Sequence, residues 1–206
     1  MPVLQQKPVT PSGRFYLKNK VELSDKRPEK SLTKGHHRKK GRNSYGRITS
    51  RRRGGGHKRL YRQIDFRRPR LGEDAKVIAL EYDPNRTAHL ALLEYSDGEK
   101  SYILAPTSVD VGDTLTSSND KIEFKPGNAM PLHQLPLGTK VHCVEMLPGA
   151  GAKIARSAGS EVRLISIDGG QASLKMPSGE IRLVKDNCRA TVGSVGNGCH
   201  QKATIG

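Results

Sequence analysis

The chain has 206 residues, of which 36 are Lys or Arg and 20 are Asp or Glu, so its formal net charge is +16 and its pI is near 10.0. No apolar run approaches the roughly 20 residues that span a bilayer, and no apolar leader core is visible at the start, so we expect a soluble, unprocessed protein. Three widely spaced cysteines argue against a disulfide framework and indicate a reducing compartment.

The charge is unevenly distributed along the chain. Residues 1–70 hold 22 Lys and Arg against 4 Asp and Glu, a net charge of +18, whereas residues 71–206 hold 14 against 16, a net charge of −2. This asymmetry predicts a cationic extension on a nearly neutral globular part, with a nucleic acid or an anionic membrane as partner. The basic part lacks the apolar helical face that a membrane-surface anchor needs. We therefore expect a nucleic-acid partner and no membrane.

Residues 1–70 are expected to form a long irregular basic arm. Residues 1–33 form a proline-containing lead-in with one short strand near residues 15–17, and a further short strand is expected at residues 64–66. Residues 34–70 contain fifteen Lys or Arg and one acidic residue, Asp65. Such a run cannot be buried, because packing like charges together is strongly unfavourable. Its interspersed glycines and aromatic residues favour an RNA-threading arm over a solvated tail, the alternative reading.

Residues 71–134 have the pattern of a small β barrel. Short β-rich segments are expected to form strands at residues 76–81, 89–95, 101–104, 111–115 and 120–125, separated by turn residues. The run from Asp83 to Arg86 is a turn, because Pro84 presets its φ while the Asp and Asn side chains bond back to the backbone. Five short strands in so few residues favour a closed barrel of the OB type.

Residues 135–206 predict a second small barrel. Strands are expected at residues 140–146, 161–167, 171–176, 181–185 and 190–195, with one helical turn near residues 153–157. Alternation places Ala172, Leu174 and Met176 on one face of their strand. Since domains of this size are marginally stable alone, we expect the two barrels to pack together.

No catalytic constellation emerges from the sequence. The glycine run at residues 54–56 does not form a phosphate-binding Walker loop. His36, His37 and His57 beside Asp65 suggest a nuclease only weakly, because no rigid scaffold holds them. His142 and Cys143 lack metal-ligand spacing, and we expect Cys143 to be a small buried hydrophobe. The sequence therefore predicts no enzyme, no metal and no cofactor.

Two arginines in the neutral part are candidate phosphate ligands. Arg86 closes the Asp-Pro-Asn turn, and Arg156 has small neighbours that leave its guanidinium accessible, so either could fork onto phosphate oxygens; an ordinary surface arginine is the alternative. Stacking of single-stranded bases would need exposed aromatic residues on barrel strands. We expect the four available aromatic residues to lie in the core instead, namely Tyr82, Tyr95, Tyr102 and Phe124. The sequence thus favours readout of RNA backbone and shape.

Six separated motifs resemble the bacterial-type ribosomal protein L-two family, the second protein of the large ribosomal subunit. They are GRITSRRRGGGHKRLYRQIDF (residues 46–66), LEYDPNRTAHLAL (80–92), YILAP (102–106), PGNAMPL (126–132), ARSAG (155–159) and CRATVGSVGN (188–197). The resemblance runs nearly end to end and in order. Family members continue past residue 206 with a glycine- and histidine-rich extension, which has no counterpart here.

The resemblance implies an OB-type barrel followed by an SH3-like barrel. It implies a structural constituent of the large ribosomal subunit that binds rRNA directly and supports assembly, subunit association and the RNA around the peptidyl-transferase centre. The implied partners are large-subunit rRNA, neighbouring ribosomal proteins and small-subunit rRNA at the subunit interface. The expected location is the bacterial cytoplasm, with an organellar ribosome as the alternative.

Residue chemistry and resemblance together give the candidate RNA-binding residues. In the resemblance, Arg86 and Arg156 match barrel arginines that the family uses on RNA, and residues 54–62 match the arm that threads between rRNA helices. The full candidate set is Arg38, Lys39, Lys40, Arg42, Arg47, Arg51, Arg52, Arg53, His57, Lys58, Arg59, Tyr61, Arg62, Arg67, Arg68, Arg86 and Arg156. A free-standing RNA-binding regulator or assembly factor remains the alternative function.

Overall fold

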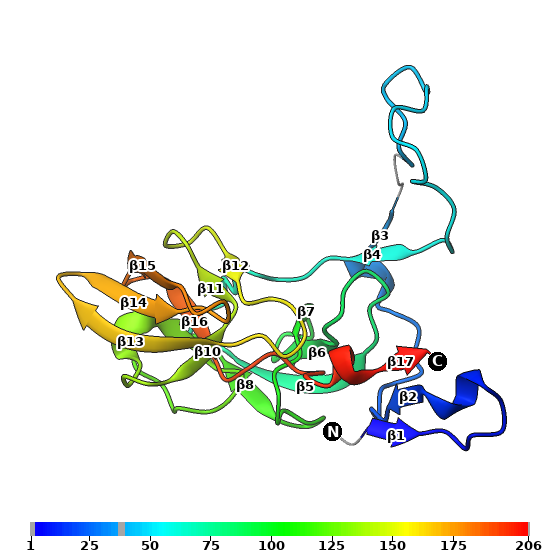
Figure 1. Cartoon of the computed structure of the whole chain (residues 1–206). Helices are drawn as coiled ribbons and strands as arrows, with labels where there is room; N and C mark the ends of the chain where they lie inside the picture. Colours follow the sequence, from blue (N-terminus) through cyan, green and yellow to red (C-terminus); the bar gives the residue numbers. More distant parts are fainter. Residues whose placement is uncertain (1–2, 37–39, 206) are drawn as a thin grey trace.

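The structure, a computed structural model, describes residues 3–36 and 40–205 (Figure 1). It is mainly β. An N-terminal lead-in, a projecting loop and two β units follow one another along the chain. The prediction of a mainly β chain, with an OB-type unit followed by an SH3-like unit, is confirmed. Among the described residues no helix is long and apolar enough to cross a membrane.

The strands fall into five antiparallel sheets in the described part of the chain. The lead-in sheet has the order β1–β2–β17, and a separate ribbon pairs β3 with β4; the bounds are β1 Val3–Gln5, β2 Tyr16–Asn19, β17 Thr204–Ile205, β3 Thr33–Gly35 and β4 Leu60–Arg62. The first barrel sheet has the order β7–β6–β5–β8, with bounds β5 Asp74–Glu81, β6 Leu90–Tyr95, β7 Lys100–Leu104 and β8 Thr114–Thr116.

The second unit contains a six-stranded sheet and a two-stranded one. The larger has the order β15–β14–β13–β10–β16–β9, with bounds β9 Ala129–Pro131, β10 Lys140–His142, β13 Val162–Asp168, β14 Gln171–Lys175, β15 Ile181–Lys185 and β16 Arg189–Val192. The smaller pairs β11 Val144–Glu145 with β12 Ala152–Ile154. Four short 3-10 turns complete the described elements: η1 Ser12–Arg14, η2 Lys30–Leu32, η3 Leu132–Gln134 and η4 His200–Lys202.

Both faces of the first barrel sheet are buried, which explains why β6 is almost entirely apolar. One face packs in a core with Val77, Leu93 and Ile103, and the other in a core with Leu92 and Tyr102. The core that contains Leu92 and Tyr102 is covered by residues from outside the barrel, namely Leu32, Ile64 and Phe66. Burying both faces therefore requires part of the predicted basic arm.

The predicted arm consequently divides into parts with different roles. The loop between β3 and β4 extends away from the body (Figure 1). Residues 60–70 instead run along the barrels, and Ile64 forms a parallel bridge with Tyr102 rather than the short strand expected there. The lead-in strand near residues 15–17 is observed as β2. The basic extension is thus a projecting loop on a packed base.

Two predicted strands are absent or broken in the barrels, and two others are shorter than expected, since residues 111–115 give only Thr114–Thr116 and residues 190–195 only Arg189–Val192. Residues 120–125 form no strand, and the predicted strand over residues 140–146 is broken at Cys143, which has a φ of 50°. β12 replaces the helical turn expected near residues 153–157. The alternation in β14 is confirmed, because Ala172 and Leu174 are fully buried and Met176 packs against the same core. β8, which ends at Thr116, belongs to the sheet of the first barrel, and β9, which begins at Ala129, belongs to the larger sheet of the second unit. The domain boundary at 134/135 stays a prediction.

The two barrels pack together through backbone hydrogen bonds, as predicted. Gly196 N donates to Ala105 O at 2.8 Å, and Thr107 N donates to Ser194 O at 2.8 Å. A Cβ on Gly196 would lie 2.9 Å from Ala105 O, so only glycine permits this approach. The barrel junction is therefore a fixed surface rather than a flexible linker.

Candidate nucleic-acid interface

The loop between β3 and β4 is folded back on itself. Asn43 Oδ1 accepts hydrogen bonds from the amides of Tyr45 at 3.1 Å and Arg47 at 3.0 Å, and Arg42 forms an isolated bridge with Ile48. Tyr45 is 88 % exposed and lies in the turn closed by the hydrogen bond from Gly46 N to Asn43 O. Every candidate cation that the structure describes on this loop is exposed, and these are Lys40, Arg42, Arg47, Arg51, Arg52, Arg53, His57, Lys58 and Arg59. The loop therefore presents its charge to solvent, while Arg38 and Lys39 lie outside the described residues.

The base of the loop is the β3–β4 ribbon, which sits on the turn after β5. Asn85 Nδ2 donates to Leu60 O at 2.6 Å, and an Nη of Arg59 donates to Pro84 O at 2.5 Å. Arg62 is buried, and one of its guanidinium nitrogens lies 3.8 Å from Asp83 Oδ1. Tyr61 is exposed, and its ring lies beside that of His36 with centroids 6.0 Å apart.

Arg86 and Arg156 lie where the two barrels meet. Arg86 is partly exposed, and its Nε donates to Asp83 Oδ2 at 2.6 Å. Arg156 is exposed, and its guanidinium carbon lies 4.9 Å from the centroid of Phe66, in a cation–π contact. Both arginines are close enough to Cys143 to favour its thiolate, although burial dominates and raises the pKa of Cys143 to about 12. The fold thus brings together two arginines that are 70 residues apart in sequence.

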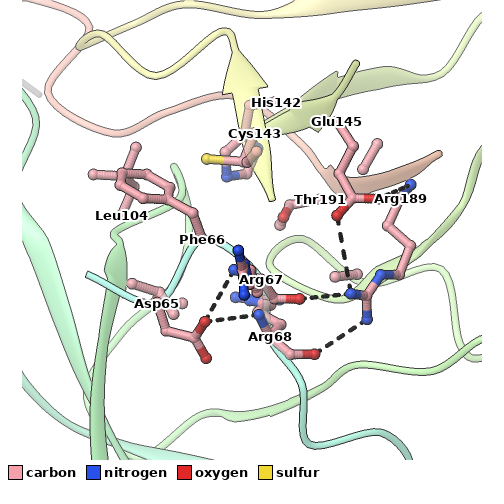
Figure 2. Close-up of a pocket in the computed structure, with 14 residues that line it drawn as sticks. Asp65, Phe66, Arg67, Arg68, Leu104, His142, Cys143, Glu145, Arg189 and Thr191 are labelled. Atoms are coloured by element: carbon pink, nitrogen blue, oxygen red, sulfur yellow. Dashed lines mark hydrogen bonds and ion pairs between the residues drawn. The ribbon is translucent and has the colours of Figure 1, made fainter. Parts of the chain in front are cut away.

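Residues 65–68 line a small cavity between the barrels (Figure 2). Asp65 Oδ1 accepts hydrogen bonds from the amides of Arg67 and Arg68, while Arg189 donates to the carbonyl oxygens of the same two residues at 2.6 and 3.1 Å. The cavity has a volume of about 30 Å³, too small for a ligand much larger than water. It is therefore part of the barrel junction and not a ligand site.

The side chains of Arg67 and Arg68 take different directions from this segment. Arg67 is exposed. Arg68 is partly buried and donates to Gly127 O at 2.7 Å, and burial lowers its pKa below the usual value. Among the described candidates, Arg62 and Arg68 have their guanidinium groups engaged inside the protein, whereas the other candidates reach the surface.

Glu145 organises the far side of the junction. Its carboxylate accepts hydrogen bonds from the amides of Gly149, Gly151 and Arg189 at 3.0 to 3.1 Å. Sequence reasoning missed Glu145 and Arg189, as it missed the roles of Asp83 and Asn85. The one available signal was the Asp-Pro-Asn-Arg turn, which indicated a local turn but not its contact with residues 59–62.

The residues behind the weaker sequence hypotheses are also placed. Tyr95 and Tyr102 are buried as expected, but Tyr82 and Phe124 are 61 % and 51 % exposed, so the core prediction is wrong for these two. His37 lies outside the described residues. Within the described ranges, no three His, Cys, Asp or Glu side chains gather as metal ligands would. Cys143 is partly exposed by surface area but packs against the apolar core around Tyr102.

Comparison with known proteins gives two family matches that together span most of the chain. Residues 29–117 match the RNA-binding N-terminal domain of ribosomal proteins L2, and residues 125–206 match their C-terminal domain. The chain is also similar to the large ribosomal subunit protein uL2 of Opitutus terrae. The two are 55 % identical over 203 residues, which cover 97 % of this chain and 70 % of that relative.

Proposed function

Because the chain belongs to the ribosomal protein L2 family and is a structural constituent of the large ribosomal subunit, we propose that it binds large-subunit rRNA through two surfaces. The first is the arm loop, residues 40–59 between β3 and β4. The second is the junction pair, Arg86 and Arg156. Family membership favours this ribosomal role over the free-standing regulator, and L2 proteins are typically structural rather than enzymatic.

The observation that carries the proposal is the exposure of the arm loop's cations on a segment that leaves the body (Figure 1). Each phosphate that such a cation neutralises releases counterions, which makes binding strong, salt-dependent and largely independent of sequence. A slender loop enters crevices of a folded RNA, whereas the fixed junction pair gives the complex its register. Arg62 and Arg68 are left out of the proposed contact set because their charges are engaged inside the protein.

The wider role follows from the same contacts. By binding rRNA directly, the protein supports subunit assembly and the RNA around the peptidyl-transferase centre. Contacts with small-subunit rRNA at the subunit interface and with neighbouring ribosomal proteins belong to this proposal. The uL2 relative is from a bacterium, so the ribosomes of the bacterial cytoplasm are the proposed location.

The first test is filter binding to large-subunit rRNA over a salt series, with the three arginines Arg51, Arg52 and Arg53 changed together to Ala. We expect weaker binding and a salt slope reduced by about two to three, since each lost phosphate contact removes roughly 0.7 to 0.9. The melting temperature should not change, because these side chains are exposed on the loop.

The matched control removes three exposed cations from the far sheet, Lys175, Arg182 and Lys185 on β14 and β15. It lowers the net charge equally, yet it should change the salt slope much less. Equal losses in the two triple variants would show that only total charge matters. A flat salt response of the unmodified protein would contradict the proposed function itself.

A further inference from the structure

The turn after β5 contains a carboxylate that is completely buried. Asp83 is 0 % exposed, although it lies in a turn at the surface of the barrel. Its Oδ1 accepts hydrogen bonds from the backbone and side-chain nitrogens of Asn85 at 2.9 and 3.1 Å, and its Oδ2 accepts one from Arg86 Nε at 2.6 Å. A buried carboxylate is stable only when paired and hydrogen-bonded in this way. Asp83 is therefore fixed in place, and so is the guanidinium that it holds.

The same turn also grips the base of the arm loop. Arg62 pairs with Asp83 Oδ1, whereas Arg86 binds Asp83 Oδ2. In addition, the Asn85 side chain donates to Leu60 O, and the Arg59 side chain donates to Pro84 O. Leu60 and Arg62 are the two ends of β4, which carries the returning end of the loop. The direction in which the loop leaves the body thus depends on contacts with one four-residue turn.

We propose that Asp83 is a positioning residue for RNA binding, which orients Arg86 toward the phosphate backbone and, through Arg62, aligns the arm loop with it. This inference rests on the proposed function and deepens it, because it couples the two RNA-contacting surfaces through one acidic side chain. A loop and a guanidinium that are already fixed lose less conformational freedom on binding, and this raises affinity.

The proposal predicts an effect opposite in sign to simple electrostatics. Asp83 is negative, so Asp83→Asn makes the protein more cationic, and charge alone would strengthen binding to a polyanion. If Asp83 acts by positioning, the same change loosens Arg86 and the arm and weakens binding. We expect about tenfold weaker binding to a large-subunit rRNA fragment, the effect of losing one charge-assisted hydrogen bond.

The matched control is Asp97→Asn. Asp97 also pairs with an arginine, since it accepts a hydrogen bond from Arg70 at 2.7 Å, but its side chain is 50 % exposed. The control changes the net charge by the same amount and also removes an ion pair. It should bind RNA as tightly as the unmodified protein, or slightly more tightly.

A double-variant cycle tests whether Asp83 works through Arg86. In the Arg86→Ala background, adding Asp83→Asn should weaken binding clearly less than tenfold, because the group that Asp83 orients is absent. A full tenfold loss in that background would overturn the coupling to Arg86. Far-ultraviolet circular dichroism at the binding temperature establishes that each variant is folded.

Should Asp83→Asn fail to fold, Asn85→Ala provides the second test. It removes the side-chain bonds to Leu60 O and to Asp83 Oδ1 while leaving the Asp83–Arg86 pair, so a folded protein with several-fold weaker binding supports the role of the turn. Unchanged binding in that variant, or unchanged or tighter binding in a folded Asp83→Asn protein, overturns the inference. In either case, salt-dependent binding by the unmodified protein would leave the proposed function standing.

Discussion

At the scale of single residues, the buried ionisable groups explain much of the structure. Asp83 and Glu145 are buried acids whose oxygens are occupied by amides and guanidinium groups. His142 is buried and neutral instead, with Nδ1 3.0 Å from Gly193 O. Burial lowers the pKa of His142 to about 4, which ties the stability of the second barrel to pH.

The unfolding free energy should fall as the pH is lowered from 7.5 to 5. Between pH 6.5 and 4 the unfolded chain binds a proton on His142 that the folded chain does not, so stability is lost at up to about 1.4 kcal/mol per pH unit. The pKa of His89 is also lowered by burial and acts in the same direction, whereas burial raises the pKa of Glu81, which acts in the opposite one. Urea unfolding at several pH values measures the slope, which should be shallower in His142→Asn. Identical slopes in the two proteins would contradict this assignment.

At the scale of elements, side chains decide where strands are absent. The segment predicted as a strand at residues 120–125 is held by the side chain of Asn128 instead. Asn128 Nδ2 donates a hydrogen bond to Glu123 O, and its Oδ1 accepts one from Thr116 N. Ser118 Oγ accepts a hydrogen bond from Asp120 N, which turns the chain at the start of the segment. The β propensity was present, but the Asn128 side chain occupies the carbonyl of Glu123 in the middle of the segment, which a neighbouring strand would otherwise bond.

The arm loop should depend on Gly41. Its φ is +69°, and a Cβ there would lie 2.3 Å from Ser50 O, within the fold of the loop. Gly41→Ala should therefore distort the loop and weaken rRNA binding at least about fivefold, equivalent to roughly 1 kcal/mol of backbone strain. The melting temperature should stay the same, because the loop projects away from both cores.

Gly54→Ala is the matched control, since a Cβ there meets nothing within 4 Å and the backbone is not in the left-handed region. In filter binding, this variant should bind rRNA as tightly as the unmodified protein does. If both glycine variants bind equally well, the loop has no preferred shape that RNA recognises.

At the scale of the whole molecule, segments that are distant in sequence are joined by strand pairing and by hydrogen bonds. β2 near the start of the chain pairs with both β1 and β17, so the two ends of the chain share a sheet (Figure 1). Residues 65–70 are held against the second barrel by Arg189, which Figure 2 shows between Glu145 and the backbone of Arg67 and Arg68. The packed base of the arm is thus stabilised by the most C-terminal barrel strand, β16.

Arg189→Met should release this segment while leaving the barrels folded. It removes two hydrogen bonds from a charged donor, a loss of about 2 kcal/mol of unfolding free energy, together with the 3.9 Å ion pair to Glu145. Glu145 keeps its three amide donors. Hydrogen exchange should be faster at the amides of Arg67 and Arg68, which donate to Asp65, and at that of Ala152, which donates to Phe66 O. Arg182→Met, an exposed arginine on β15, serves as the control. Unchanged protection in the Arg189 variant would show that other contacts hold the segment.

The sequence by itself determined the mainly β fold, the positions of most barrel strands and the concentration of positive charge in the first 70 residues. These depend on local alternation, turn chemistry and composition, which are readable without neighbours. It also proposed Arg86 and Arg156 as RNA ligands, which stays a prediction, and it could not show that the two lie at the same junction.

Only the tertiary structure decided which of the arm's residues project and which pack. The outer face of the first barrel sheet needs an apolar cover, and Ile64 and Phe66 supply it, so residues 60–70 belong to the body despite their charge. It likewise made Asp83 and Arg62 partners, because an ion pair between residues 21 positions apart forms only when β4 and the turn after β5 meet. Such pairings are set by long-range packing, which leaves no periodic trace in the sequence.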